Sequence, residues 1–283
     1  TAPGERRVAI VPETVKKLAA RKIDVVVETG AGMASSFSDA EYQAAGGQIA
    51  ASFEDLAGRV DAVVKVVRPN DGEFAALKSG AALVCLQYPL SSADFVKAAN
   101  AKKLMTIALD MIPRTTLAQA MDVLSSQANF AGYWAVVAAA TRLPKIFPML
   151  MTAAGTVTPS RVLIMGTGVA GLQAIGTAKR LGAIVEATDV RPETKEQVES
   201  LGGKFLLVQG VEYKQGAGGY AVEQSDEYKK AQAAMISAAI AKADVVITTA
   251  LIPGRKAPVL VTDDQVRSMR AGSVIVDLAA EQG

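Results

Sequence analysis

The sequence predicts an α/β protein made of two doubly wound parallel-sheet domains that linking helices join. Three observations favour this fold class. Short runs of β-branched and apolar residues alternate with helix-like stretches in the first half, and the same alternation returns in the second half. Between the halves, residues 119–146 have a helical composition without a strand pattern, as expected for one or two linking helices.

The first half of the chain alternates strand and helix candidates in a regular order. The expected strands are residues 7–11, 24–28, 61–67, 81–86 and 104–108. The expected helices are residues 12–21, 38–45, 71–78 and 93–101. Ser38 and Glu41 have the spacing of a capping box at the start of the second helix. Residues 1–125 are therefore expected to form an N-terminal, flavodoxin-like α/β domain.

The second half repeats this pattern. The expected strands are residues 161–165, 184–188, 204–208, 244–248 and 273–277. The expected helices are residues 169–181, 192–201, 226–242 and 263–269. Pro192 suits a first helical position, and Gly202 suits the residue just past a helix end. Residues 126–283 are expected to form a linking helix and the second sheet domain.

The composition excludes several functional classes. The chain has 283 residues and a net charge of +2, without a block of Lys or Arg, so no nucleic-acid-binding face is predicted. It contains no histidine, which removes the commonest general acid or base and the commonest metal ligand. No metal site is predicted. The single cysteine, Cys85, lies in an apolar run and is expected to be a buried structural thiol.

A dinucleotide-binding fingerprint opens the second half. The expected strand 161–165 leads directly into Gly166-Thr-Gly-Val-Ala-Gly171 and a helix, and Asp189 ends the next strand about 20 residues later. Gly166 permits a tight turn, Gly168 lets a pyrophosphate approach the backbone, and Gly171 lets helix and strand pack closely. The N-terminus of the helix then favours the anion. This order of elements predicts a Rossmann domain that binds NAD(H).

Asp189 indicates which dinucleotide binds. Its carboxylate can accept hydrogen bonds from the ribose hydroxyls, whereas it would repel a 2′-phosphate, so NAD(H) is predicted over NADP(H). Arg191 argues against NAD(H) preference, because an arginine near this position can accept a 2′-phosphate. We interpret Arg191 as secondary, because Asp189 occupies the end of the strand. Residues 248–253 should lie at the same edge of the sheet. The glycine-rich stretch 209–225, which includes Tyr220, reads equally well as a lid or as an ordinary surface loop.

A polar cluster precedes the linking segment. Gln119, Asp122 and either Ser125 or Ser126 recur at three- and four-residue spacing, which predicts that they share one helix face, and Arg114 precedes that helix. These groups would suit a carboxamide and a ribose. On spacing alone, a solvated helix face with a cap explains the pattern better.

A resemblance to a known family favours the functional interpretation. Residues 114–133, 151–157, 166–205 and 248–254 closely resemble the NAD(H)-binding domain of proton-translocating nicotinamide nucleotide transhydrogenase, whose sister family is alanine dehydrogenase. The resemblance runs over residues 4–283. It implies a soluble homodimer that holds NAD(H) facing NADP(H) on a partner domain, with direct hydride transfer between the two nicotinamides. It also implies a membrane-spanning proton-channel partner, and a peripheral location on the cytoplasmic side of a bacterial inner membrane, or the matrix side in mitochondria.

The resemblance also assigns site residues. Arg114, Gln119, Asp122 and Ser125 resemble the nicotinamide-side group, and Gln119 resembles the residue that bridges toward the second nucleotide. Their role is positioning, because direct transfer needs orientation and exclusion of water. The remaining cofactor-binding positions implied by the resemblance and the fingerprint are Thr115, Thr116, Gly166, Thr167, Gly168, Val169, Ala170, Gly171, Asp189, Val190, Arg191, Gly219, Tyr220, Gln232, Thr249, Ala250 and Leu251.

Two other functions remain open from the sequence, an alanine-dehydrogenase-like oxidoreductase and a non-catalytic NAD-binding module. The sister family implies a substrate lysine and a histidine on two strands of the first domain. Lys65 matches the lysine position, whereas Gln87 stands at the histidine position, so the proton donor for keto-acid reduction is missing. Lys65 is then expected to be an interdomain or surface charge. The resemblance also implies that the first domain lacks a C-terminal return segment.

Overall fold

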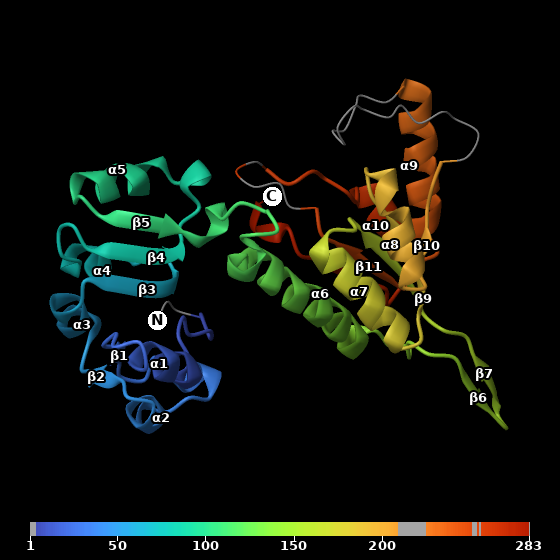
Figure 1. The fold of residues 1–283 in the computed structure, drawn as a ribbon. Helices are drawn as coiled ribbons and strands as arrows, with labels where there is room; N and C mark the ends of the chain where they lie inside the picture. The colour runs from blue at the N-terminus through green and yellow to red at the C-terminus, as the bar shows by residue number, and fades with distance from the viewer. Residues whose placement is uncertain (1–3, 209–224, 251–253, 255, 283) are drawn as a thin grey trace. The chain divides into compact units, whose positions relative to one another are not determined.

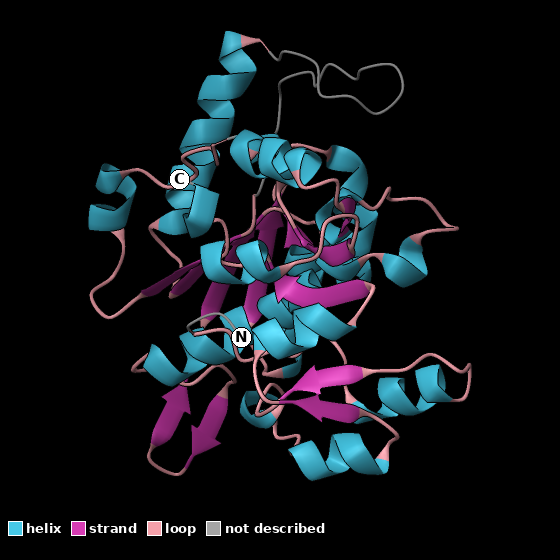
Figure 2. Ribbon diagram, turned by 90° about the vertical axis from the view of Figure 1, so that its left-hand side faces the viewer, coloured by secondary structure: helices cyan, strands magenta, loops and turns pink. Residues whose placement is uncertain are grey.

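The computed structural model describes residues 4–208, 225–250, 254 and 256–282 (Figure 1). The chain divides into two compact units, unit 1 (Thr1–Leu124) and unit 2 (Ser125–Gly283). Helices flank the strands in both units (Figure 1), and Figure 2 shows the helices and strands from a second side. The predicted α/β class with parallel sheets is confirmed, and each unit is described separately below.

The described part of unit 2 contains one five-stranded sheet. Its strands run in the order β10-β9-β8-β11-β12, and every pair in it is parallel. The bounds are β8 (Arg161–Met165), β9 (Ile184–Thr188), β10 (Lys204–Phe205), β11 (Val245–Thr248) and β12 (Val274–Asp277). The chain moves outward in one direction from β8 to β10 and in the other from β11 to β12. The strand order therefore reverses between β8 and β11, which makes this the point where ligands bind in such sheets.

Helices cover both faces of this sheet. They are α6 (Val123–Arg142), α7 (Val169–Arg180), α8 (Lys195–Ser200), α9 (Asp226–Ile240) and α10 (Asp263–Ser268). Ile164 and Ile247 pack on the face covered by α6 and α7, whereas Leu163 and Val246 pack on the face covered by α9. These four side chains are at most 2% exposed. A strand buried on both faces needs a continuous apolar run, which is the pattern of β8 and β11.

Several local predictions for unit 2 are confirmed. Strands β8 and β9 have the predicted bounds. Pro192 opens a 3-10 turn (Pro192–Thr194) directly before α8, and Gly202 follows that helix with a φ of +79°. Residues 204–208 form a shorter strand than predicted, because only Lys204 and Phe205 pair with β9.

An antiparallel hairpin in unit 2 was not predicted. It consists of β6 (Leu150–Thr152) and β7 (Gly155–Val157), and all six residues are exposed. The hairpin extends away from the five-stranded sheet (Figure 1). With neither face buried, the segment lacks the alternation of apolar and polar residues on which strand prediction depends.

The described part of unit 1 contains two separate parallel sheets, β1-β2 and β3-β4-β5. The strands are β1 (Val26–Glu28), β2 (Gln48–Ala50), β3 (Ala62–Val67), β4 (Ala82–Leu86) and β5 (Met105–Ala108). The helices are α1 (Pro12–Ala19), α2 (Asp39–Ala44), α3 (Phe53–Arg59), α4 (Asp71–Ala76) and α5 (Ala93–Ala101). The predicted capping box is present, since Ser38 accepts from the Glu41 backbone and Glu41 accepts from the Ser38 backbone.

Two predictions for unit 1 need correction. Residues 7–11 were expected to form a strand, but they have no strand structure. Side chains bind the backbone of this region instead: the Tyr42 hydroxyl donates to the Ile10 carbonyl (2.8 Å) and the Ser35 hydroxyl to the Arg6 carbonyl (2.6 Å). Strand propensity depends on such context. Strand β2 was not predicted, because three residues are too few to show a clear period, and helix α3 was not predicted either.

Candidate functional site

The candidate site of unit 2 lies where β8 ends, at the reversal of strand order. Gly166 has a φ of +101°, which favours glycine, and a Cβ atom there would lie 2.4 Å from the Thr249 hydroxyl. A Cβ atom on Gly171 would lie 1.9 Å from the Gly166 carbonyl oxygen. A Cβ atom on Gly168 would meet nothing within 4 Å. The turn therefore needs Gly166 and Gly171 for its own packing, and it leaves open space at Gly168.

The N-terminus of α7 is arranged to receive an anion. Gly168 occupies the N-cap position, and neither a side-chain cap nor an acidic residue lies in the first turn. The first N–H groups of a helix have no partner within the helix and carry the positive end of its dipole. A phosphate that approached through the space at Gly168 would meet these groups directly.

Asp189, one residue beyond β9, is held by a dense set of hydrogen bonds. The Thr167 N–H donates to Oδ2 (2.7 Å) and the Arg191 N–H donates to Oδ1 (2.9 Å). The Arg191 guanidinium adds Nε to Oδ1 and Nη2 to Oδ2, both at 3.0 Å. The Asp189 side chain is 6% exposed and that of Arg191 is 47% exposed. The guanidinium thus covers the carboxylate that follows the end of β9.

Burial and hydrogen bonding act on Asp189 in opposite directions. Burial raises the pKa of the Asp189 carboxyl, but the hydrogen bonds from Arg191 and Thr167 outweigh burial and place the pKa below its ordinary value. The Thr167 hydroxyl lies 2.9 Å from Asp189 Oδ2 and 2.7 Å from the Thr194 hydroxyl, which donates to the Arg191 carbonyl (2.8 Å). This buried network fixes the anionic carboxylate and the turn at residue 191.

The end of β11 closes the other side of the glycine turn. The Thr249 N–H donates to the Met165 carbonyl (2.9 Å) and its hydroxyl to the Gly166 carbonyl (3.1 Å). Ala250 follows and is partly buried. The Thr248 hydroxyl donates to Asp277 Oδ1 (2.7 Å) at the end of β12. Sequence reasoning did not select Asp277, although it ends a strand at the carboxyl edge as Asp189 does.

The structure describes only some of the predicted nucleotide-binding residues. Val190 is 67% exposed beside Asp189, and Gln232 is a partly buried residue of α9. Gly219, Tyr220 and Leu251 lie outside the described residues. The roles of all these positions in nucleotide binding stay predictions.

The polar cluster does not form one helix face, so that prediction is wrong. Gln119 belongs to a 3-10 turn (Gln119–Met121), Asp122 has a non-helical ψ of 86°, and Ser125 lies in α6. Asp122 is buried directly before α6, where aspartate is a preferred cap, and this break rotates Gln119 out of register with Ser125.

The residues before this break are exposed. Arg114, Thr115 and Thr116 lie on an exposed turn of unit 1. Because the polar cluster falls mainly in unit 1 and the glycine turn in unit 2, their joint action stays a prediction.

Lys65 of β3 does not behave as the expected interdomain or surface charge. Its ammonium forms an ion pair with Glu73 of α4, and the two side chains are only 11% and 13% exposed. The ammonium also lies 4.8 Å from the Phe53 ring centroid. Burial raises the pKa of Glu73, but hydrogen bonds from Lys65 and Asn70 lower it further than burial raises it. Lys65 is therefore committed to packing within unit 1.

Gln87 and Cys85 are also internal residues of unit 1. Gln87 is 3% exposed, and its side-chain amide lies 3.4 Å from the Leu83 carbonyl. The backbone N–H groups of Gln87 and Tyr88 both donate to Asp110 (2.6 and 3.0 Å). Cys85 is fully buried, and burial raises its pKa to about 11, which confirms the predicted structural thiol.

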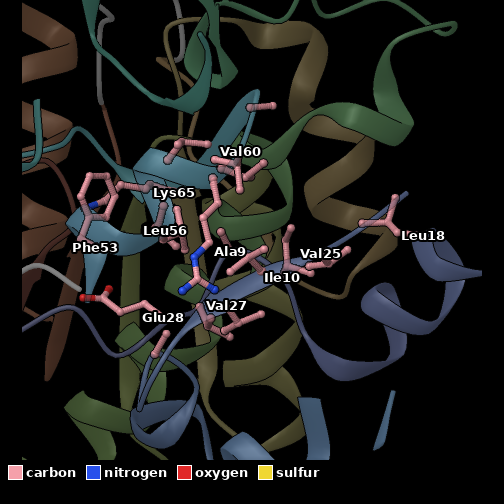
Figure 3. A pocket seen from close by; sticks show the side chains of 18 of the residues that line it. Ala9, Ile10, Leu18, Val25, Val27, Glu28, Phe53, Leu56, Val60 and Lys65 are labelled. Carbon is pink, nitrogen blue, oxygen red and sulfur yellow. The ribbon is translucent and has the colours of Figure 1, made fainter. Parts of the chain in front are cut away.

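Unit 1 contains a cavity of about 660 Å³ between its two sheets (Figure 3). Strands β1 and β3, each an edge strand of its sheet, line it together with residues 7–10. Val25, Val27 and Leu56 make much of its wall apolar, and Lys65 lies at its rim beside Phe53 (Figure 3). The residues that line it include no phosphate-binding turn like that of unit 2, so we do not assign the nucleotide to it.

The described residues provide neither a metal site nor a membrane span. Within residues 4–208, 225–250, 254 and 256–282, no group of three or more Asp, Glu or Cys side chains could hold a metal ion. In the same ranges no helix is both long enough and apolar enough to cross a bilayer.

Comparison with known proteins identifies relatives over the whole chain. Residues 1–131 match the family described as alanine dehydrogenase/PNT, N-terminal domain, and residues 135–283 match its C-terminal domain. An NAD(P) transhydrogenase subunit alpha of Rhodospirillum rubrum is 51% identical, with 99% of this chain and 75% of the relative covered. An alanine dehydrogenase of Mycolicibacterium smegmatis is 29% identical over 99% of this chain and 70% of the relative.

Solved structures show the same two relationships. A transhydrogenase from Sinorhizobium meliloti superposes with a TM-score of 0.91 at 49% identity, over 100% of this chain and 77% of that chain. An L-alanine dehydrogenase superposes with a TM-score of 0.80 at 29% identity, over 99% and 72%. Both similarities span unit 1 and unit 2.

Proposed function

Since the chain belongs to the alanine dehydrogenase/PNT family, we propose that it is the NAD(H)-binding component of a proton-translocating transhydrogenase. In this role it presents NADH to NADP⁺ on a partner domain, and hydride passes directly between the two nicotinamides. The observation that carries the proposal is the glycine turn on β8, which combines open space at Gly168, the uncapped N-terminus of α7 and the fixed carboxylate of Asp189.

The residues of unit 2 would bind and orient the nucleotide. The pyrophosphate approaches the backbone at Gly168, between Thr167 and Val169, and meets the N–H groups of α7. Asp189, with Val190 beside it, would receive the adenosine ribose, because an acid at the end of the second strand binds the ribose hydroxyls in such folds. Thr249 holds the glycine turn through the Gly166 carbonyl. Bound NADH supplies the hydride, so the protein needs to contribute position and not a proton.

The polar cluster of unit 1 would act at the nicotinamide end. Arg114, Gln119 and Asp122, with Ser125, offer donors and acceptors for the carboxamide and its ribose, and Gln119 reaches toward the second nucleotide. The chain contains no histidine, and a transfer between two nicotinamides requires none.

The proposal includes partners and a location. The chain acts as a homodimer with an NADP(H)-binding domain and a membrane-spanning proton-channel domain of the same complex. It is then peripheral on the cytoplasmic side of a bacterial inner membrane, or on the matrix side in mitochondria. The relatives named as subunit alpha support a multi-subunit assembly.

The test is to mix the purified chain with an NADP(H)-binding domain of a related transhydrogenase and follow reduction of an NAD analogue by NADPH. We expect exchange only when both proteins are present, and NADH binding by the chain alone. Gln119→Ala should lower the exchange rate about 100-fold with little loss of NADH affinity, because misplacing the nicotinamides impairs transfer more than binding. Exchange by the chain alone would overturn the need for a partner.

The second candidate function is an alanine-dehydrogenase-like oxidoreductase, which the similarity to alanine dehydrogenases favours. Gln87 in place of an acid argues against it, because a neutral amide cannot deliver the proton that keto-acid reduction needs. An assay with pyruvate, ammonia and NADH separates the two, and alanine formation by the chain would overturn the transhydrogenase proposal. NADH binding with neither reaction would leave a non-catalytic NAD-binding module.

A further inference from the structure

Arg191 and Asp189 form a pair whose two members have opposite preferences for a nucleotide. In a fold of this type, an acid at the end of the second strand receives the ribose hydroxyls of NAD, whereas a nearby arginine receives the 2′-phosphate of NADP. Here both residues are present, two positions apart, and they bind each other through two guanidinium hydrogen bonds of 3.0 Å.

We propose that Arg191 is a latent 2′-phosphate site that Asp189 keeps closed. Asp189 rejects the 2′-phosphate by its own charge and also by occupying the guanidinium that would otherwise bind it. The inference rests on the proposed NAD(H)-binding site and names the pair that sets its specificity. It predicts that NAD(H) preference in this chain depends on one carboxylate and weakens when that carboxylate is neutralised.

The geometry supports a guanidinium that can change partners. Asp189 is anchored from inside by the Thr167 N–H (2.7 Å), and its side chain is 6% exposed, so the carboxylate cannot move far. The Arg191 side chain is 47% exposed, so its guanidinium lies at the surface of the site. Releasing Asp189 therefore requires motion of Arg191 only.

The backbone at Arg191 is held at its N–H, which donates to Asp189 Oδ1 (2.9 Å), and at its carbonyl, which accepts from Thr194. The Thr194 hydroxyl donates to the Arg191 carbonyl (2.8 Å), and the Thr194 N–H donates to the same carbonyl (3.2 Å). The two bonds from Thr194 to the Arg191 carbonyl do not involve Asp189, so removing the Asp189 charge should free the Arg191 side chain while these bonds still hold the turn at residues 191–194. The hydrogen bond with Asp189 raises the pKa of Arg191 most and the charge of Glu193 raises it further, so Glu193 is kept in every variant.

Two substitutions of Asp189 test the proposal. Asparagine changes the charge of the side chain but not its shape, and serine changes both. Asp189→Asn keeps an oxygen that can accept from the Thr167 N–H, and it removes the charge that holds Arg191. Asp189→Ser removes both the acceptor oxygen for Thr167 and the charge. This variant is the test to use if the amide of Asp189→Asn binds Arg191 in place of the carboxylate. Each Asp189 variant is combined with Arg191→Ala. The matched control for loss of a positive charge is Arg180→Ala, since Arg180 is exposed and lies at the far end of α7.

The measurement is binding of NADH, NADPH, 5′-AMP and 2′-AMP to each purified protein, by nucleotide fluorescence and calorimetry. We expect Asp189→Asn to bind NADPH and 2′-AMP at least about tenfold more tightly than the wild type, since an ionised donor pairs with phosphate. Arg191→Ala in the same chain should remove this gain, and Arg180→Ala should not. The gained affinity should also fall as salt is raised.

Three results would overturn the proposal. They are no gain in NADPH and 2′-AMP affinity in either Asp189 variant, a gain that survives Arg191→Ala, or a gain lost equally in Arg180→Ala. Failure of the wild type to bind NADH would instead overturn the proposed function. In that case the 2′-AMP arm still tests Arg191, because it needs the adenosine end of the site alone. Thermal melts of each variant establish that it is folded.

Discussion

Both units are built from parallel strands and flanking helices, but among the residues that the structure describes only unit 2 joins its parallel strands into one sheet. In unit 2, β8 lies between β9 and β11 and carries the glycine turn. In unit 1, a cavity of about 660 Å³ lies between the edge strands β1 and β3 of two separate sheets. Because the central strand of a doubly wound sheet leads into the helix that faces the ligand, only unit 2 offers a phosphate-binding turn among the described residues.

The comparison of the two units shows that the size of a cavity and the chemistry of its lining are separate properties. The cavity of unit 1 is large and partly apolar, yet Lys65 at its rim is committed to Glu73. The site of unit 2 is an open edge with unfilled space at Gly168 and a helix N-terminus. The proposed nucleotide binding depends on directed N–H groups and a fixed carboxylate, and among the described residues unit 2 is where these two features come together.

The largest expected effect concerns the glycine turn on β8. Gly171→Ala should destabilise unit 2 by about 3 kcal/mol, because its Cβ atom would lie 1.9 Å from the Gly166 carbonyl oxygen and the backbone must move. Gly168→Ala should keep the stability of the wild type and lose NADH affinity, because its Cβ atom fills only the open space. Thermal unfolding and NADH titration measure the two effects.

The matched control is Gly176→Ala in the middle of α7. Its Cβ atom would meet only the ends of flexible side chains at 3.8 Å or more, so stability should stay level or rise, as alanine favours a helix. If the Gly171→Ala protein were as stable as this control, α7 would be able to move away from β8 without cost. The close packing assigned to the turn would then be wrong.

The second prediction compares one substitution in the two sheets. Val246→Ala in β11, where the side chain is 0% exposed, should cost about 2 kcal/mol. Val64→Ala in β3, where the side chain is 39% exposed at the cavity, should cost under about 1 kcal/mol. Each unit has its own probe, since Trp134 is the single tryptophan and Cys85 the single cysteine.

Unfolding is therefore followed by Trp134 fluorescence for unit 2 and by labelling of Cys85 for unit 1. Val246→Ala should shift the Trp134 transition, and Val64→Ala should barely change the onset of Cys85 labelling. Equal costs for the two substitutions would mean that β3 is as tightly enclosed as β11. The contrast between a continuous and a divided sheet would then not extend to stability.

The smallest effect concerns acid. Because the folded pKa of Asp189 lies below its ordinary value, its contribution to stability is present above about pH 4 and is lost as the pH falls through the folded pKa. As the pH is lowered from about 6 to about 3, Asp189→Asn should therefore lose less unit 2 stability than the wild type. The difference should stay below about 1 kcal/mol, because water screens the half-exposed guanidinium.

Glu73→Gln is the matching variant in unit 1, since the folded pKa of Glu73 is also lowered. Its effect on the acid dependence of stability should appear in Cys85 labelling, which reports on unit 1. The Trp134 transition, which reports on unit 2, should stay unchanged. If Asp189→Asn instead steepened the acid dependence of the Trp134 transition, the carboxylate would have to be neutral in the folded protein. The charge assigned to the Asp189–Arg191 pair would then be wrong.

Local patterns in the sequence were enough to predict many features of both units. These features depend on residues close together in the chain. They are the bounds of β8 and β9, the helix cap at Ser38, the helical start at Pro192 and the turn at Gly166. Such features are set by backbone conformation and by the period of apolar residues. The order of strand, glycines, helix, strand and acid was therefore predicted correctly, and the nucleotide site assigned to it stays a prediction.

Other features depend on residues far apart in the sequence, and the sequence did not predict them. The Lys65–Glu73 pair, the approach of Thr249 to Gly166 and the threonine network at Asp189 need two or more elements to be packed first. The expected strand at residues 7–11 failed for the same reason, because distant side chains bind its backbone. Strand pairing and side-chain partners are properties of the folded surroundings.

The sequence by itself determined that this protein has a glycine turn on a parallel sheet, followed by an acid, in a chain without histidine. Only the tertiary structure decided that Asp189 is held by Arg191 and Thr167, and that Gly168 alone among the three glycines faces open space. The reason is physical: a motif fixes which groups are available, whereas packing decides which of them are already paired and which remain free for a ligand.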